Sequence, residues 1–253
     1  MNPTRYAKDL LKRFLAARGY EVFRRPHLPK GADIFESLRS HWPDFQPTVI
    51  FDVGANIGQT VFRIRRYFPL STIHSFEPIP STFANLTANV SKDSLVRCHA
   101  IALADREGQA SLQLHGSSEH NSLNPALRGT LGTAGPLIDV SLETVAGFCA
   151  RHNISHIDLM KIDVEGFELQ VLTGAAPLFV TGDIDYIVAE AGLMPGHPRF
   201  TPLPAMIQLL RSHGFWLVGV YEQFGSRYLE TAECCNVLFA HERKLTRSPL
   251  SVE

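Results

Sequence analysis

The sequence predicts an α/β fold, with one mostly parallel sheet covered by helices on both faces. Three observations support this prediction. The run Val49–Val53 is short, apolar and rich in β-branched residues, which is typical of a strand buried on both faces. Gly54 and Gly58 then bound a tight turn that leads into a helix. Strands and helices alternate from there to the end of the chain, as they do in a doubly wound Rossmann-like sheet.

The alternation predicts each element in turn. Core strands are expected at Val49–Val53, Thr72–Phe76, Val96–Ala102, Ile157–Ile162, Ile184–Ala189, Trp216–Val220 and Asn236–Ala240. Helices are expected at Ile57–Phe68, Ser81–Val90, Leu142–His152, Glu168–Thr173 and Pro204–His213, with Ser81 and Thr201 as N-caps. Two further strands, near Ala110–Leu114 and Ile138–Ser141, are expected to flank a loop over the sheet edge. Because the last two core strands lie close in sequence, they favour an antiparallel terminal hairpin.

The first 47 residues differ from the rest, and we expect them to form an extension before a domain at 48–241 and a tail at 242–253. Basic residues outnumber acidic ones up to Lys30, and apolar residues recur at helical spacing over Tyr6–Ala17. This basic amphipathic helix is expected to pack on the core or on a second subunit of a homodimer. The alternative is a surface helix that approaches a membrane or an anionic glycolipid. Pro26–Pro47 is expected to be a connector with a short helix around Ile34–His41.

Composition limits the class of protein. A chain of 253 residues can bury one substantial core, and a net charge of -1 favours neither nucleic acid nor an acidic membrane as a partner. The four cysteines, Cys98, Cys149, Cys234 and Cys235, have no C-x-x-C spacing, and the adjacent pair is poorly placed for a disulfide. No apolar run is long enough for a transmembrane helix, and the N-terminus lacks a secretion signal. These features predict a cytoplasmic protein.

The turn after the first strand points to an adenosine-containing cofactor. About twenty residues beyond it, the second predicted strand ends at Glu77, whose carboxylate can accept hydrogen bonds from both hydroxyls of a ribose. A dinucleotide site favours the pattern G-x-G-x-x-G, whereas Gly54 and Gly58 are separated by three residues, among them Asn56. Asp52 would repel a phosphate but suits a cofactor with positive charge. The pattern favours S-adenosylmethionine, a sulfonium without phosphate, over a nicotinamide dinucleotide.

A third motif follows the strand at Ile157–Ile162. The run Lys161–Glu168 (KIDVEGFE) places Asp163 and Glu165 at the sheet edge where α/β proteins bind ligands. With this run, with Asp52–Gly58 (DVGANIG) and with Phe76–Pro78 (FEP), the chain resembles the FkbM family of S-adenosylmethionine-dependent methyltransferases. The resemblance extends over about Val49 to Ala240 and includes a segment at 100–108. The KIDVEGFE run is the most particular to that family.

The resemblance implies a class I methyltransferase sheet and assigns a cofactor site. By the family pattern, Asp52, Gly54 and Asn56 line the methionine end of the cofactor and Glu77 holds the ribose. The other residues expected to bind the cofactor are Ala55, Gly58, Pro78, Ile79, Ala102, Leu103 and Asp163. Ile79, Ala102 and Leu103 would lie near the adenine. Asp52 could instead cap the turn, and Glu77 could be a surface acid.

Three acids are the main candidates for the chemistry, namely Asp163, Glu165 and Glu190. A hydroxyl acceptor loses its proton during attack, and a placed carboxylate or histidine can take it. The acids could alternatively bind a divalent metal, with Asp163 and Glu190 as ligands. Ala191 follows Glu190, however, so the ligand set of catechol-type methyltransferases is incomplete and a metal is not favoured. Glu165 could also cap the next helix.

Other polar residues are weaker candidates. His120, in a polar loop, is a candidate base or acceptor contact, and the span Ser117 to Gly135 is a candidate lid. His197 could close the acceptor pocket, and Lys161 is expected to pair with a neighbouring acid.

The predicted function is methyl transfer from S-adenosylmethionine to a hydroxyl oxygen. The resemblance implies an acceptor on a sugar of a glycan or glycolipid, or on a secondary metabolite. The alternatives are a nucleotide-dependent oxidoreductase and a non-catalytic cofactor-binding protein. Nucleic acid is not an expected acceptor, because the core has neither a basic stripe nor an Asn-Pro-Pro-Tyr motif.

Overall fold

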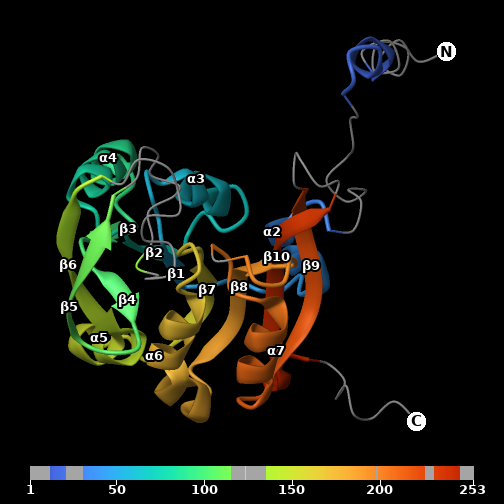
Figure 1. Cartoon of the computed structure of the whole chain (residues 1–253). Coiled ribbons are helices and arrows are strands. Elements are labelled where there is room, and N and C mark those ends of the chain that lie inside the picture. The colour runs from blue at the N-terminus through green and yellow to red at the C-terminus, as the bar shows by residue number, and fades with distance from the viewer. Residues whose placement is uncertain are drawn as a thin grey trace.

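A seven-stranded sheet forms the centre of the computed structural model, which describes residues 12–20, 31–114, 123, 135–197, 199–225 and 231–245. The strand order is β3-β2-β1-β7-β8-β10-β9 (Figure 1). The strands are β1 (Val49–Val53), β2 (Thr72–Phe76), β3 (Val96–His99), β7 (Ile157–Ile162), β8 (Ile184–Gly192), β9 (Phe215–Gly225) and β10 (Ala232–His241). Strand β10 runs antiparallel to both of its neighbours, while β3, β2, β1, β7 and β8 pair in parallel. The predicted Rossmann-like sheet with its antiparallel hairpin is confirmed.

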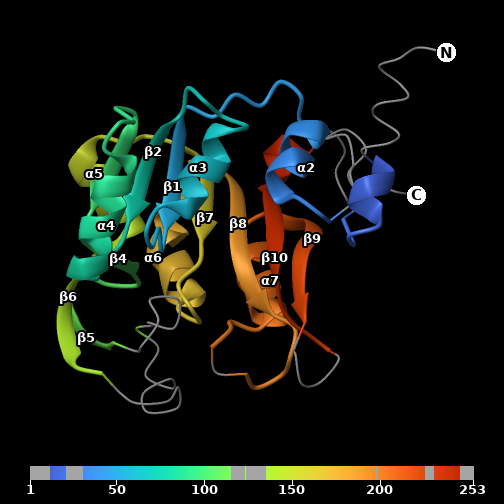
Figure 2. The ribbon, with the colours of Figure 1, turned by 90° about the horizontal axis from the view of Figure 1, so that it is seen from above.

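Helices cover both faces of this sheet (Figure 2). One face carries α2 (Ile34–His41), α3 (Gln59–Arg65) and α4 (Pro80–Val90), and the other carries α5 (Val145–His152), α6 (Glu168–Thr181) and α7 (Leu203–Arg211). On β1, Ile50 packs with the first set of helices and Phe51 packs with the second. Successive side chains of a strand point to opposite faces, so a sheet covered twice requires a continuous apolar run.

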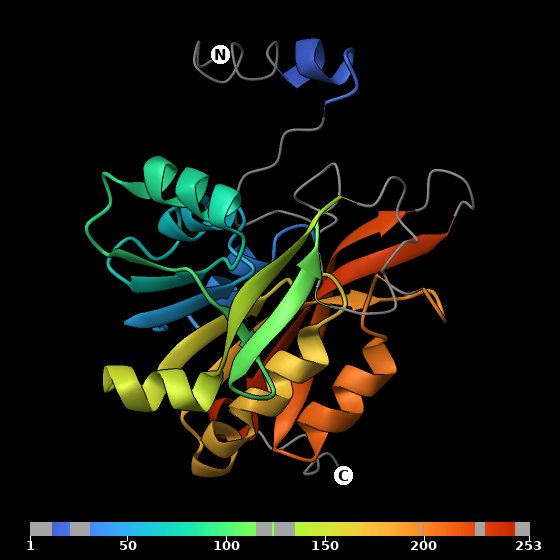
Figure 3. The same cartoon turned by 60° about the vertical axis from the view of Figure 1, so that its left-hand side comes forward.

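A small second sheet lies beside the main one, with the order β4-β6-β5 (Figure 3). Its strands are β4 (Ala102–Ala104), β5 (Gly108–Gln113) and β6 (Leu137–Thr144). The two extra strands expected near 110–114 and 138–141 are therefore confirmed. The single strand expected at Val96–Ala102 is wrong, because β3 ends at His99 and the chain bends before it enters the second sheet as β4.

Several boundary predictions are also wrong, and three of them have a clear local reason. Helix α6 continues to Thr181, past the predicted end at Thr173. Gly174 allows this continuation beside β4, because a Cβ there would lie 1.9 Å from the Ala104 carbonyl oxygen. Ser81 is not an N-cap, since α4 begins at Pro80 with proline in its first turn. Thr201 is not one either, since its hydroxyl bonds to Glu168 and α7 starts after Pro202.

The segment before β1 contributes to the core. Helix α2 forms where a short helix was expected, and Asp33 caps it by accepting hydrogen bonds from the backbone N–H groups of Phe35 and Glu36. Ile34, Phe35 and Leu38 are buried. Residues 12–16 are helical, and the rest of the predicted Tyr6–Ala17 helix lies outside the described residues apart from Ala17, which lies in a turn. Within the described ranges, we find no helix with both the length and the apolar composition needed to cross a bilayer.

Candidate active site

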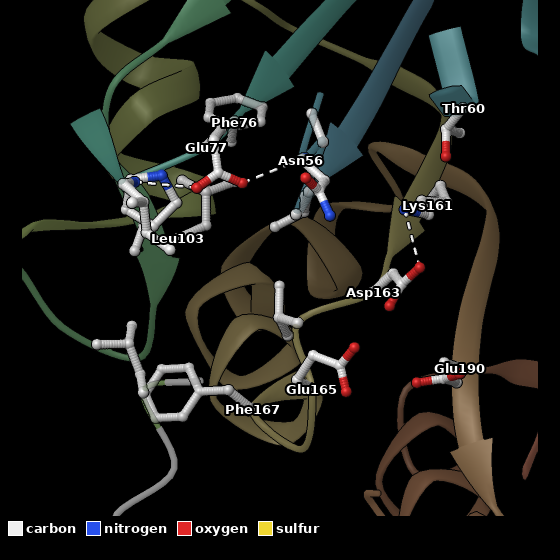
Figure 4. A pocket seen from close by; sticks show the side chains of 18 of the residues that line it. Asn56, Thr60, Phe76, Glu77, Leu103, Lys161, Asp163, Glu165, Phe167 and Glu190 are labelled. Carbon is white, nitrogen blue, oxygen red and sulfur yellow. Dashed lines mark hydrogen bonds and ion pairs between the residues drawn. The ribbon is translucent and has the colours of Figure 1, made fainter. Parts of the chain in front are cut away.

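A cavity of about 540 Å³ opens at the carboxyl ends of the parallel strands (Figure 4). Residues that follow β1, β2 and β7 line it, together with Glu190 on β8. The chain order reverses between β1 and β7, so this edge is the switch point where doubly wound sheets bind ligands. In Figure 4, Glu77 lies on one side of the cavity, and Asp163, Glu165 and Glu190 lie on the other.

The turn after β1 forms the floor between these two sides. Gly54 has a φ of 78°, and a Cβ at this position would lie 1.8 Å from the Asp163 carbonyl oxygen, so only glycine fits. The backbone N–H groups of Gly54 and Ala55 both donate to the Phe76 carbonyl oxygen. Asn56 is also left-handed, with a φ of 47°. Its side-chain oxygen Oδ1 is buried and has no hydrogen-bond partner among the described residues.

Glu77 is held by backbone donors from two different turns. Its Oε2 accepts a hydrogen bond from the Asn56 N–H at 3.1 Å, and its Oε1 accepts one from the Ile79 N–H at 2.9 Å. The residue is only 6% exposed, yet it lines the cavity. Burial raises the pKa of the Glu77 carboxyl to about 7, although the two N–H donors act in the opposite direction. The carboxylate is thus fixed in place before any ligand arrives.

A buried lysine connects the turn after β1 with the end of β7. The Lys161 ammonium lies 3.4 Å from an Asp52 oxygen and 3.3 Å from an Asp163 oxygen. Burial opposes the charge, but the two carboxylates outweigh it and raise the pKa of Lys161. Asp52 is fully buried and does not line the cavity, whereas Lys161 and Asp163 do. The predicted pairing of Lys161 with a neighbouring acid is confirmed.

Glu165 faces a cation from a distant loop. The chain leaves β7 and turns at Glu165, which has a φ of 55°, and at Gly166, which has a φ of 87°. The carboxylate of Glu165 pairs with the guanidinium of Arg199 through both Nε and Nη2, the second contact at 2.8 Å. Arg199 lies between β8 and α7, so the ion pair joins two loops across the cavity.

Glu190 completes a cluster of acids. Carboxylate oxygens of Asp163, Glu165 and Glu190 all lie within 4.8 Å of one another. Burial raises the pKa of Glu190 to about 8, the neighbouring acids add to this effect, and Arg199 opposes it. Cys234 on β10 lines the same part of the cavity, and burial raises the pKa of its thiol to about 12, with Glu190 adding to the shift.

The opposite end of the cavity is apolar. Ile79, Leu103 and Phe167 are buried and line it, and Ala102 and Pro78 lie beside them. Ile79, Ala102 and Phe167 pack together with residues of the second sheet. This end therefore has the character that a flat aromatic ring such as adenine needs.

The structure brings together most of the residues predicted from the sequence. The predicted residues that line the cavity are Gly54, Ala55, Asn56, Glu77, Pro78, Ile79, Ala102, Leu103, Asp163, Glu165 and Glu190. Asp52 and Gly58 do not line it, because Asp52 is buried beneath Lys161 and Gly58 packs against α4. His197 does not line it either, since its ring stacks on Phe200. His120 and most of the predicted lid lie outside the described residues.

Several cavity residues were not predicted. Arg199, Phe200 and Cys234 stand in segments without a motif, so no local pattern could identify them. Glu168 does not line the cavity. It belongs to the KIDVEGFE run, but nothing in that run predicts which groups its carboxylate contacts.

Comparison with known proteins identifies the family. The model of the methyltransferase FkbM domain matches residues 52–217. The chain belongs to this family. It is 31% identical, over 70% of its length and 76% of the relative's, to the 31-O-demethyl-FK506 methyltransferase FkbM of Streptomyces tacrolimicus. It is also 25% identical to the 2-O-methyltransferase NoeI of Sinorhizobium fredii, over 65% of this chain and 71% of NoeI. The resemblance found in the sequence is confirmed.

Proposed function

We propose that this FkbM-family chain transfers a methyl group from S-adenosylmethionine to a hydroxyl oxygen. The observation that carries the proposal is the division of one cavity into two ends. A carboxylate fixed by backbone N–H groups and an apolar wall form one end, and a cluster of three acids forms the other. The first end suits a nucleoside, and the second suits a group that must lose a proton.

The residues at the first end fit S-adenosylmethionine. Both oxygens of Glu77 retain acceptor capacity for the two ribose hydroxyls, because each accepts one backbone N–H. Oδ1 of Asn56 is a buried acceptor without a partner among the described residues, and it would receive a hydrogen bond from the cofactor's ammonium. Leu103 and Ile79 would contact the adenine.

The acids at the second end handle the hydroxyl acceptor. When bound, S-adenosylmethionine supplies a methyl group that is already activated on a sulfonium. The protein therefore has to align the acceptor oxygen and take its proton. Glu190 suits the second task, because a base whose pKa of about 8 lies near the working pH is efficient. Asp163, fixed by Lys161, would accept a hydrogen bond from a second hydroxyl of the acceptor and so help to orient it.

A divalent metal could also occupy the acid cluster, but one contact disfavours it. Glu165 makes a two-point ion pair with Arg199, so a metal would have to compete with a guanidinium for one of its three ligands. The acids retain a proton-handling role without a metal.

The acceptor end favours a neutral, hydroxylated ring. Phe200 and Phe224 line the cavity near the acids, and Glu233 adds a further carboxylate. Aromatic faces beside carboxylates suit the apolar face and the hydroxyls of a sugar, whereas an anionic acceptor would be repelled. The relative NoeI is named a 2-O-methyltransferase.

Calorimetric titration of the purified protein tests the proposal. S-adenosylmethionine, S-adenosylhomocysteine and NAD are titrated separately, with and without Mg²⁺. Binding of the two sulfur compounds alone is expected. Binding of NAD alone would replace the proposal with a dehydrogenase. Methyl transfer is then measured as S-adenosylhomocysteine release on a panel of monosaccharides and methyl glycosides.

A further inference from the structure

Glu165 occupies a backbone conformation that needs external support. Its φ of 55° is left-handed, which is unfavourable for a residue with a side chain, and Gly166 continues the turn. Such residues persist where neighbouring contacts hold them. One such contact comes from Glu168, three residues later, at the start of α6.

The carboxylate of Glu168 holds the backbone on both sides of Glu165. Its Oε1 accepts hydrogen bonds from the Val164 N–H and from the Gly166 N–H, each at 3.2 Å. Glu168 is 1% exposed, so water cannot replace either bond. The donors flank Glu165 directly, and opening of the turn would therefore leave the buried Oε1 of Glu168 without these two partners.

The other oxygen of Glu168 reaches the opposite loop. Oε2 accepts a hydrogen bond from the hydroxyl of Thr201, which is also buried. Thr201 is fixed in turn to the end of β8, where its carbonyl oxygen accepts the Gly192 N–H at 2.8 Å. Two residues before Thr201 stands Arg199, which pairs with Glu165. The two loops are thus joined by Glu165–Arg199 at the cavity and by Glu168–Thr201 beneath it.

We propose that Glu168 and Thr201 form an internal brace that positions Glu165 and Arg199 beside Glu190. The effect of this brace on catalysis rests on the proposed function. Its effect on the structure of the two loops does not. Glu168 does not line the cavity, so it is a positioning residue and not a catalytic one. Without it, the acids would remain in the protein and lose their alignment with the acceptor.

Thr201→Val is the principal test, because valine has nearly the same shape and lacks the hydroxyl. Hydrogen–deuterium exchange of the ligand-free protein is expected to quicken in both loops, the turn after β7 and the loop that precedes α7. Thr201→Ser retains the hydroxyl and is expected to restore slow exchange. The matched control is Thr173→Val on the exposed face of α6, where the lost bond goes to the Leu169 carbonyl oxygen of the same helix.

Kinetics give the second readout. Thr201→Val is expected to lower kcat by up to about a hundredfold, as small misplacements of catalytic groups do. The dissociation constant for S-adenosylhomocysteine and the KM for S-adenosylmethionine should not change. Glu168→Gln, which can still accept both N–H bonds, is expected to lose less activity than Glu168→Ala.

Two results would overturn the brace. One is unchanged exchange in both loops of Thr201→Val, and the other is faster exchange in the Thr201 loop alone. If Thr201→Val does not fold, exchange in the turn after β7 is compared between Glu168→Gln, which keeps both N–H bonds, and Glu168→Ala, which keeps neither. Faster exchange is expected in Glu168→Ala alone, and equal exchange in the two variants would overturn the brace. Failure of wild type to bind S-adenosylmethionine would instead contradict the proposed function and leave the exchange result valid.

Discussion

The two ends of the cavity are built in different ways. At the cofactor end, Glu77 is held by backbone N–H groups from the turns after β1 and β2. At the acceptor end, Glu165 is held by the side chain of Arg199, 34 residues away. Backbone donors fix a group once the strands are in place, whereas side-chain pairs depend on how distant loops pack. The geometry of the cofactor end therefore follows from the strands and their turns, whereas the geometry of the acceptor end depends on the packing of two distant loops.

Asp163→Asn should have the largest effect and should affect only the acceptor end. Asparagine is nearly isosteric but cannot carry the charge that pairs with Lys161. We expect methyl transfer to be abolished while the affinity for S-adenosylhomocysteine is largely retained, measured by S-adenosylhomocysteine release and by calorimetry. The exposed Asp44→Asn serves as the control. An active Asp163→Asn protein would remove Asp163 from the chemistry.

Glu190→Gln should have the next largest effect. Removal of a general base costs about 10²- to 10⁴-fold in rate. In wild type, the carboxyl is protonated below its pKa of about 8 and becomes a base as the pH rises. The rate should therefore increase through pH 8 in wild type and lose this rise in Glu190→Gln. If Glu190→Gln keeps both the rate and the pH profile of wild type, another group must take the proton from the acceptor hydroxyl.

Glu77→Gln tests the cofactor end alone. The amide can accept only one of the two backbone N–H bonds well, and it presents fewer acceptors to a ribose. Cofactor binding should weaken by about 1–3 kcal/mol in calorimetry, the cost of unpaired hydroxyls. In wild type, affinity should also weaken as the pH falls below about 7, because protonated Glu77 is a poorer acceptor. Glu242→Gln, at an exposed position, is the control. Unchanged affinity in Glu77→Gln would show that Glu77 does not bind the cofactor.

The difference between the two ends of the cavity also explains which site residues the sequence could predict. Asn56 and Glu77 stand in short local patterns whose geometry follows from a strand and a tight turn, and the structure places both at the cavity. Arg199 and Thr201 meet Glu165 and Glu168 from positions 34 and 33 residues away, in a loop with no recognisable pattern. The end of α6 escaped prediction for a related reason. A glycine such as Gly174 is typical of a helix end. Only its close approach to Ala104 in the structure explains why a glycine lies inside this helix.

Arg199→Gln should have the smallest effect on the rate. It tests whether the charge of Arg199 influences the pKa of Glu190. The positive charge of Arg199 lowers the pKa of Glu190, against the burial and the acids that raise it. Its removal should therefore move the rising limb of the rate–pH profile to higher pH. The rate at pH 7 should fall and should recover at higher pH, whereas a purely structural loss would lower the rate at every pH. Arg106→Gln, which removes an exposed ion pair with Asp105, should leave the profile in place. A profile that stays fixed in Arg199→Gln would mean that Arg199 holds Glu165 without influencing Glu190.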